Sequence, residues 1–322
     1  MHPLEATFET RFLSAPARMM DPAKAVKKYT RSAAGMKALA QDIRPPSMLA
    51  ATVAYLLGSE VFGNESIPFS VRYSFIADRL LAVRQDATMQ DLAAKRMPPE
   101  IRGIFENAVR FYIFSQARLG GQDSTVEGFD ATLNMRSLQT CLTFVLEIHQ
   151  IDCIAKRLKE EFISYQVLTL CIFGDGRGCE LADLTSVSST SALTFAKHTT
   201  LCFRNLNYSS FFEHFMPLDN PAFITDDNRA LYLSKCLAHE LTERMRILAL
   251  NVMNAAFNKA EKFPISELVR ILKFESQDSA IRCCARAGVV VHLAGSSDKS
   301  NAGFSYAQFH VTKTLSPEPH ET

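Results

Sequence analysis

The chain has 322 residues, of which 47% are hydrophobic and 21% charged, and its formal net charge is +1. These values exclude wholesale disorder and fit a globular chain long enough for one large or two smaller domains. No run approaches about 18 uncharged apolar residues, and the N-terminus lacks a basic region followed by an apolar one, so neither a membrane span nor a secretory signal is predicted.

Positive charge is concentrated at the two ends of the chain. Residues 1–44 contain eight Lys/Arg against four acidic residues, and residues 262–313 contain seven Lys/Arg against four. The region between these ends is mildly acidic. This distribution favours contact with a polyanion at the ends and with a protein partner in the middle.

The first predicted elements follow a flexible N-terminal arm, residues 1–20. The stretch DPAKAVKKYTRSAAG (21–35) predicts a basic helix that begins with an Asp-Pro cap and ends at glycine. RPPSMLAATVAYLLG (44–58) predicts a second helix after the tandem prolines, with Ser47 as its cap and Gly58 as its stop. The basic side chains and the tyrosine of the first helix belong to the family resemblance described below, and they are Lys24, Lys27, Lys28, Tyr29 and Arg31.

A third helix is predicted from about residue 70 to about residue 95, and it contains the charged stretch FIADRLLAVRQD. Its apolar side chains recur at helical spacing and form one buried stripe. At about 100° per residue, Arg79 and Arg84 flank that stripe, while Asp78 points away from it. We therefore expect the charged residues to reach neighbouring helices and to hold them in register through charge-assisted hydrogen bonds. The stripe is Ile76, Leu80, Val83 and Ala87, and the predicted ties between helices are Asp78, Arg79, Arg84 and Asp86.

Further apolar-periodic segments follow one another as helical pairs up to residue 257. The predicted fold is therefore mostly α, with stacked helical hairpins as in a solenoid, although no fixed-period repeat is legible. The family resemblance described below implies that this solenoid is TPR/PCI-like. This helical domain is placed at residues 21–261. The further helices are predicted at 98–121, 134–150, 151–173, 191–203, 207–216 and 227–257.

The pattern changes at Pro264, where shorter segments begin. Two short helices precede two strands joined by a polar turn, which is the outline of a winged helix. We place this C-terminal winged helix at residues 262–313 and a disordered tail at 314–322. The helices are predicted at 265–274 and 276–288, and the strands at 289–295 and 304–311.

The second of these helices is the usual recognition helix of a winged helix, and it carries Arg282 and Arg286 one turn apart on one face. Phosphate contacts from such positions give salt-dependent, sequence-tolerant binding to RNA or DNA. The alternative is that the segment contacts another protein and that its arginines are ordinary surface residues. The candidate nucleic-acid-binding residues are Arg270, Lys273, Arg282, Arg286 and Lys299.

No catalytic, cofactor or metal site is predicted. His239-Glu240 lacks the second histidine of a zinc-protease motif, and the glycine-rich stretch 174–178 lacks the Lys-Ser/Thr of a phosphate loop. His149 and Cys153 share a helix face, but no second pair of ligands has suitable spacing. The eight scattered cysteines are expected to be buried and reduced. We therefore expect a protein that is not an enzyme.

Several stretches together resemble the signature of the suppressor-of-actin/GANP (germinal-centre-associated nuclear protein) family. FIADRLLAVRQD matches its phenylalanine-x-x-Asp-Arg-x-x-Ala-x-Arg-x-Asp pattern, and NLNYSSFFEHF (205–215) is similar to its asparagine-tyrosine-x-x-phenylalanine-phenylalanine stretch. RPPSMLAATVAYLL resembles most the short members called SAC domain-containing protein. The other matching stretches are 21–35, 75–90, 105–119 and 129–150.

The resemblance implies a non-enzymatic scaffold of the nuclear mRNA export complex associated with transcription, the TREX complex, which acts in mRNA export or in transcription-coupled mRNA processing. In that family the helical layers and the winged helix pair with a PCI-domain protein and a small acidic subunit, and the joined winged helices contact RNA or DNA. The implied protein is therefore a nuclear subunit of a hetero-oligomer. The short members imply an alternative, a protein of the centrosome, spindle or cytoplasm that acts in cell division through protein contacts only.

Overall fold

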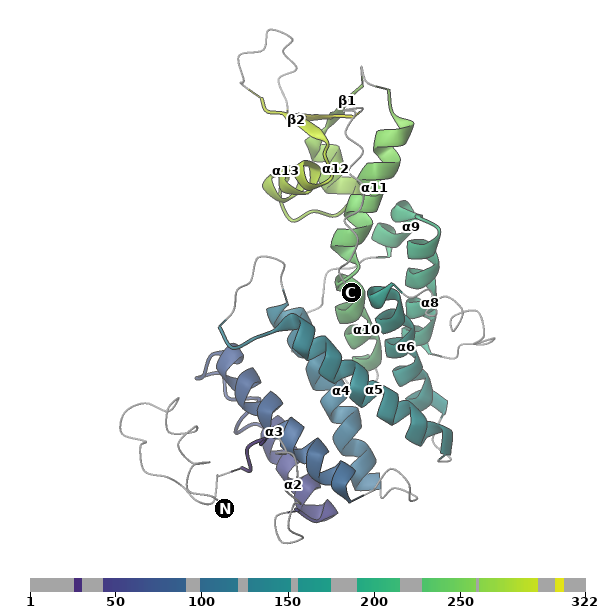
Figure 1. Cartoon of the computed structure of the whole chain (residues 1–322). Coiled ribbons are helices and arrows are strands. Elements are labelled where there is room, and N and C mark those ends of the chain that lie inside the picture. Colours follow the sequence, from purple (N-terminus) through teal and green to yellow (C-terminus); the bar gives the residue numbers. More distant parts are fainter. Residues whose placement is uncertain are drawn as a thin grey trace. The chain divides into compact units, whose positions relative to one another are not determined.

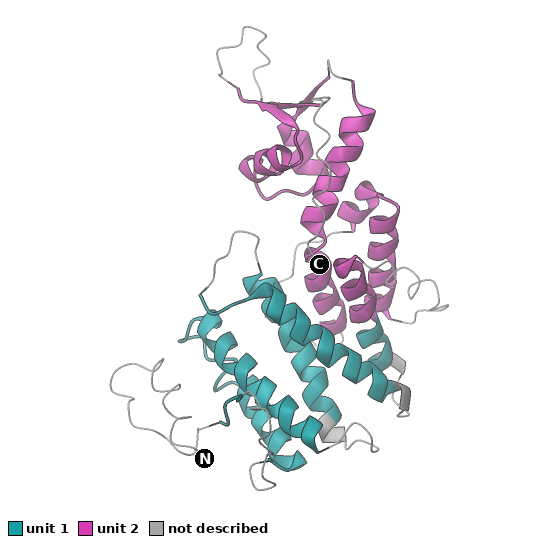
Figure 2. Ribbon diagram, viewed as in Figure 1, with its two compact units in different colours: residues 1–163 teal, residues 164–322 magenta. Residues whose placement is uncertain are grey.

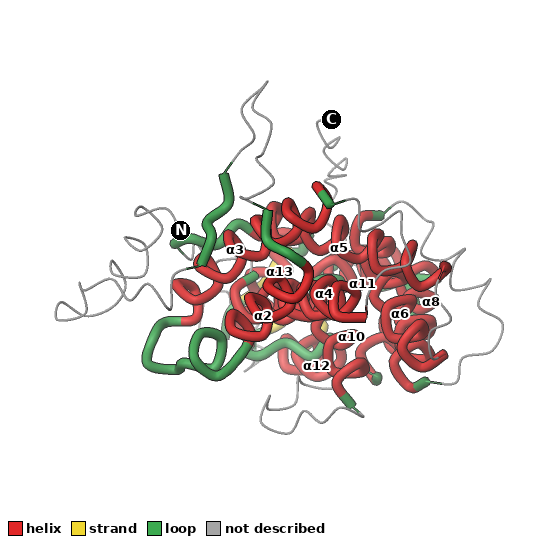
Figure 3. Tube along the Cα trace, turned by 90° about the horizontal axis from the view of Figure 1, so that it is seen from below, coloured by secondary structure: helices red, strands yellow, loops and turns green. Residues whose placement is uncertain are grey.

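The computed structural model describes residues 26–30, 43–90, 99–120, 127–151, 156–174, 190–214, 228–258, 261–294 and 305–309. The chain divides into two compact units, residues 1–163 and 164–322 (Figure 2). Helices make up most of the described chain and strands are few (Figures 1 and 3), which confirms the mostly α fold. Among the described residues, no helix has the length and apolar character that crossing a membrane requires. The domain boundaries expected from the sequence remain predictions.

The first unit contains the helices that were expected from the apolar periodicity. α2 packs against α3 and α4, and α4 packs along α5. α2 begins at Pro46, which needs no N–H partner in the first turn, and the predicted cap at Ser47 is wrong because no side chain caps this helix. The helices are α2 (Pro46–Leu57), α3 (Phe69–Met89), α4 (Pro99–Leu119) and α5 (Ala131–Ile151), and α6 (Lys156–Phe173) passes from the first unit into the second.

The predicted basic helix at 21–35 is wrong for its described part, because residues 26–30 are not helical. The backbone N–H of Tyr29 donates to Asp78 of α3 at 3.3 Å, and Gln85 donates to the Thr30 carbonyl at 3.3 Å. Val26 is buried at the start of this segment. Contacts with α3 therefore replace the hydrogen bonds of a local helix, as tertiary context often overrides helix propensity.

The core of the first unit confirms the predicted apolar stripe of α3. Its four side chains are between 0% and 4% exposed. α4 contributes a second buried row, and Phe111 of that row stacks on Tyr73 of α3 at a ring separation of 5.8 Å. The periodicity of the sequence thus placed the buried faces correctly in this unit.

The second unit continues with α8 (Ser191–Arg204), α9 (Tyr208–Glu213), α10 (Arg229–His239) and α11 (Thr242–Ala256). α8 packs against both α9 and α10. The single helix expected at 227–257 is two helices, since the chain turns at Glu240 and Leu241. Neither turn residue is a glycine or a proline, so the sequence gives no breaker signal at this point. Both residues keep near-helical φ and ψ values.

The C-terminal part of this unit contains β1 (Lys262–Pro264), α12 (Ile265–Ile271), α13 (Gln277–Arg286), β2 (Val290–His292) and β3 (Tyr306–Gln308). The strands form one antiparallel sheet in the order β1-β3-β2. The helix, helix, strand, strand order agrees with the expectation, whereas β1 was not expected. Ser276 caps α13 and Gly288 follows it at φ +72°, both as expected. That this arrangement is a winged helix remains a prediction.

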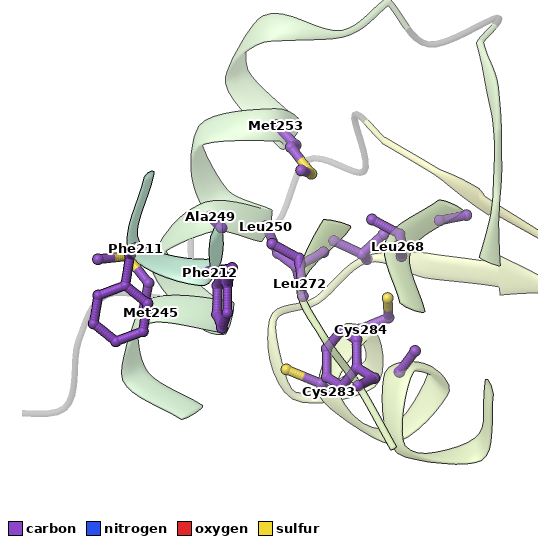
Figure 4. Close-up of a cluster of buried hydrophobic side chains, with 14 of the residues drawn as sticks. Phe211, Phe212, Met245, Ala249, Leu250, Met253, Leu268, Leu272, Cys283 and Cys284 are labelled. Atoms are coloured by element: carbon purple, nitrogen blue, oxygen red, sulfur yellow. The ribbon is translucent and has the colours of Figure 1, made fainter. Parts of the chain in front are cut away.

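One apolar cluster joins α11 to these C-terminal elements. Leu250 and Met253 of α11 face Leu268 and Leu272 around α12, and the two cysteines of α13 complete the group (Figure 4). Burial raises the pKa of Cys283 to about 11 and that of Cys284 to about 12, so both thiols stay protonated near neutral pH. The cysteines that the structure describes are all buried and outside disulfides, as expected: Cys141, Cys171, Cys202, Cys236, Cys283 and Cys284.

Candidate functional site

The charged stretch of α3 holds one carboxylate between two cations. The Asp86 side chain is 1% exposed. Its Oδ1 accepts from Lys27 Nζ at 2.7 Å, and its Oδ2 accepts from Arg44 Nε at 2.7 Å. Lys27 lies in the segment 26–30, and Arg44 lies just before α2. Asp86 therefore fixes two pieces of the N-terminal chain to the middle of the unit.

About two turns earlier on α3, Asp78 and Arg79 form a second pair. Asp78 Oδ2 accepts from Arg79 Nη1 at 2.9 Å as well as from the Tyr29 backbone. The Arg79 side chain is 1% exposed, and its guanidinium lies 4.3 Å from the centre of the Phe75 ring. A buried guanidinium that is stacked and paired in this way is a structural cation rather than a surface charge.

Arg84 makes the remaining contact of the motif. Its Nη1 lies 3.7 Å from the Cys141 sulfur of α5. Burial raises the pKa of the Cys141 thiol, and Arg84 opposes that rise. Arg84 thus contacts another helix, whereas the contacts of Asp78 and Asp86 to other elements run to the segment 26–30 and to Arg44, and Asp78 and Phe75, the partners of Arg79 described above, lie on α3 itself. That these four residues hold the helices in register remains a prediction.

In the second unit, a hydrogen-bonded arginine joins α11 to the turn after α12. Arg246 donates to the backbone carbonyls of Leu272 and Lys273, and its guanidinium lies 4.3 Å from the centre of the Phe274 ring. Lys273 has φ +50°, a left-handed conformation that is unfavourable for lysine. The two carbonyl contacts explain how the turn between α12 and α13 keeps this conformation.

Glu243 connects that arginine to α13. Its Oε1 accepts from Arg246 Nη1 at 2.6 Å, and its Oε2 accepts from Arg286 Nη2 at 2.5 Å. The Glu243 side chain is 23% exposed and that of Arg286 is 47% exposed. One of the predicted nucleic-acid-binding residues is therefore already paired with a carboxylate.

The other predicted binding residues are distributed around α12 and α13. Arg282 is exposed and donates to Ser279 Oγ at 3.2 Å. Arg270 is exposed and pairs with Glu267 at 2.9 Å, and Lys273 is exposed at the turn. The predicted residues Lys24, Arg31 and Lys299 lie outside the described residues.

Histidines in the described part of the chain have protein partners. His149 is 3% exposed, and its Nε2 lies 2.9 Å from Glu106 Oε1 of α4. Cys153, which shares its predicted helix face, lies outside the described residues. Burial lowers the pKa of His239, and Arg246 adds to the lowering. No group of three or more potential metal ligands occurs among the residues that can be described.

Comparison with known proteins identifies the family to which this sequence belongs. The sequence matches the SAC3/GANP family over residues 6–292. The chain belongs to the SAC3/GANP family. It is similar to SAC3 family protein B of Arabidopsis thaliana (27% identical over 269 residues), Protein xmas of Drosophila melanogaster (25% over 295) and SAC3 family protein 1 of Schizosaccharomyces pombe (27% over 285). These matches cover 79%, 84% and 81% of this chain but only 15%, 13% and 26% of the relatives, so the chain spans a small part of their length.

Sequence reasoning missed three charged residues that connect distant segments of this SAC3/GANP chain through hydrogen bonds. Arg44 binds Asp86 from 42 residues away, and Arg246 and Glu243 meet the α12–α13 region from α11. The only local signal is the i, i+3 spacing of Glu243 and Arg246, which is common on solvated helices. Their partners are set by the tertiary fold, so one sequence offers no sign of them.

Asp86→Asn is expected to lower the free energy of unfolding of the SAC3/GANP chain by about 3 kcal/mol, because it leaves Lys27 and Arg44 facing a neutral amide. Chemical denaturation followed by circular dichroism measures the change. Glu60→Gln is the matched control in the same unit, since it neutralises one exposed carboxylate and is expected to cost about 1 kcal/mol or less. Equal losses in the two variants would contradict the role assigned to Asp86.

Proposed function

We propose that this SAC3/GANP chain is a scaffold subunit without catalytic activity that pairs with a PCI-domain protein and contacts RNA in nuclear mRNA export. The observation that carries the proposal is the family match over residues 6–292, which includes the helical layers and most of the C-terminal elements. The mostly helical architecture and the acidic middle of the chain are compatible with broad protein contacts.

The basic residues around α13 support an RNA contact. Arg282 and Lys273 are exposed on α13 and on the turn that precedes it, and neither forms an ion pair with an acidic side chain within the described residues. Cations in such positions bind phosphates without reading bases, so the expected affinity depends on salt and tolerates sequence changes. Such a contact suits a scaffold that must accept many different messenger RNAs.

The partner proposal is tested by purifying the tagged protein from its own cells at physiological salt and identifying what co-elutes. Recovery of a PCI-domain protein together with a small acidic subunit supports the export scaffold. Recovery of centrosomal or spindle components alone would overturn it in favour of a role in cell division.

The RNA contact predicts that Arg282→Glu weakens binding to single-stranded RNA about tenfold and lowers the salt dependence by about one released ion. Fluorescence anisotropy at several salt concentrations measures both quantities. Arg136→Glu is the matched control, because it reverses one exposed charge on α5 in the other unit. An equal loss in both variants, or none in Arg282→Glu, would remove α13 from the RNA interface.

A further inference from the structure

Arg286 and Glu243 form an ion pair on the helix proposed to face RNA. Arg286 lies in the last turn of α13, and its Nη2 is 2.5 Å from Glu243 Oε2 of α11. Arg282 lies one turn earlier on the same face, and it donates to the Ser279 hydroxyl instead of to a carboxylate. Two arginines in the same predicted role therefore differ in their electrostatic surroundings.

A phosphate and a carboxylate compete for the same guanidinium. Both anions accept hydrogen bonds from its planar fork of N–H donors. A guanidinium already paired with Glu243 presents little net charge to an approaching RNA strand, and a phosphate placed there would lie close to the carboxylate. The Arg286 side chain is 47% exposed, so an RNA strand can reach it without unfolding the helix.

Neutralising Glu243 breaks its ion pair with Arg286 and leaves the contacts that stabilise the turn after α12 in place. Arg246, its other partner, keeps two backbone carbonyls and the Phe274 ring when the carboxylate is neutralised. The two interactions therefore have separate roles. Arg246 stabilises the turn after α12, whereas the ion pair between Glu243 and Arg286 connects α11 to the surface of α13.

We propose that Glu243 is an internal competitor for RNA phosphate at Arg286 and so sets how tightly α13 binds RNA. This inference rests on the proposed RNA contact and specifies its regulation. In the protein without RNA, Arg282 can contact a phosphate, whereas Arg286 is paired with Glu243. Any event that neutralises or draws away Glu243, such as a cationic side chain of a partner, delivers a second arginine to the interface.

The test compares the full-length chain with Glu243→Gln, Arg286→Ala and the double variant by fluorescence anisotropy on single-stranded poly(U) RNA. Glu243→Gln is expected to tighten binding about threefold to tenfold and to steepen the salt dependence by about one ion. Most of this gain is expected to be lost when Arg286 is alanine, because only the repulsion between the carboxylate and an approaching phosphate is then removed. Asp278→Asn is the matched control, since it removes one exposed acidic charge from the first turn of α13, and a change of about twofold or less is expected.

A second comparison does not depend on altering Glu243. Because Arg286 is held and Arg282 is not, Arg286→Ala is expected to weaken binding less than Arg282→Ala. The inference is overturned if Arg286→Ala costs as much as Arg282→Ala, if Glu243→Gln binds like the unaltered chain, or if its full gain survives in the double variant. Failure of both the unaltered chain and Glu243→Gln to bind RNA would overturn the RNA contact itself. Salt-dependent binding that Glu243→Gln leaves unchanged would overturn this inference alone.

Discussion

Arg79→Ala is expected to lower the free energy of unfolding of the first unit by about 4 kcal/mol. The substitution removes one of the largest fully buried side chains of the described structure, and it takes away the cation that Asp78 accepts from. It also ends the stacking on Phe75. Urea denaturation followed by circular dichroism gives the magnitude, and hydrogen exchange of α3 peptides places the loss in this unit.

Arg79→Met separates the two causes. Methionine fills much of the same volume without a charge, and Asp78 is exposed enough for water to replace its lost donor. We expect this variant to lose about 2 kcal/mol, less than alanine, because the cavity is avoided. If alanine melted like the unaltered chain, the buried position assigned to Arg79 would be wrong. Equal losses in both variants would assign the effect to charge alone.

Arg246→Ala is expected to cost about 3 kcal/mol and to loosen the C-terminal elements selectively. It removes two hydrogen bonds from a charged donor to the carbonyls of Leu272 and Lys273, together with the ring contact to Phe274. The left-handed Lys273 then lacks the contacts that offset its backbone strain. Hydrogen exchange is expected to rise first in α12 and in the turn before α13.

Arg244→Ala is the matched control for that experiment. Arg244 lies two residues earlier on α11, is exposed, and donates to the single carbonyl of Ile172 at 2.6 Å. We expect it to cost about 1 kcal/mol and to leave exchange in α12 unchanged. A uniform rise in exchange throughout the second unit after Arg246→Ala would contradict a local role for that side chain.

The sequence was sufficient for several features that local physics decides. The apolar spacing of α3 located its buried face, and the Ser276 cap and Gly288 located the ends of α13 because both act within one turn. The order of helices followed from the same reasoning.

Elements set by distant contacts were not predictable. Residues 26–30 lie between a helix-start and a helix-stop signal but bind Asp78 and Asp86, 49 and 59 residues away. β1 has three residues and exists because β3 pairs with it. Arg246 meets its carbonyls 26 and 27 residues along the chain. In each case the deciding partner is set by the completed fold and leaves no periodic trace in the sequence.

The attachment of residues 26–30 to α3 has a consequence for the order of folding during synthesis. This segment leaves the ribosome before its anchoring carboxylates exist, since Asp86 follows Lys27 by 59 residues. It cannot be anchored until α3 has been made. The earliest-made of the described residues are therefore anchored only after α3 has been made.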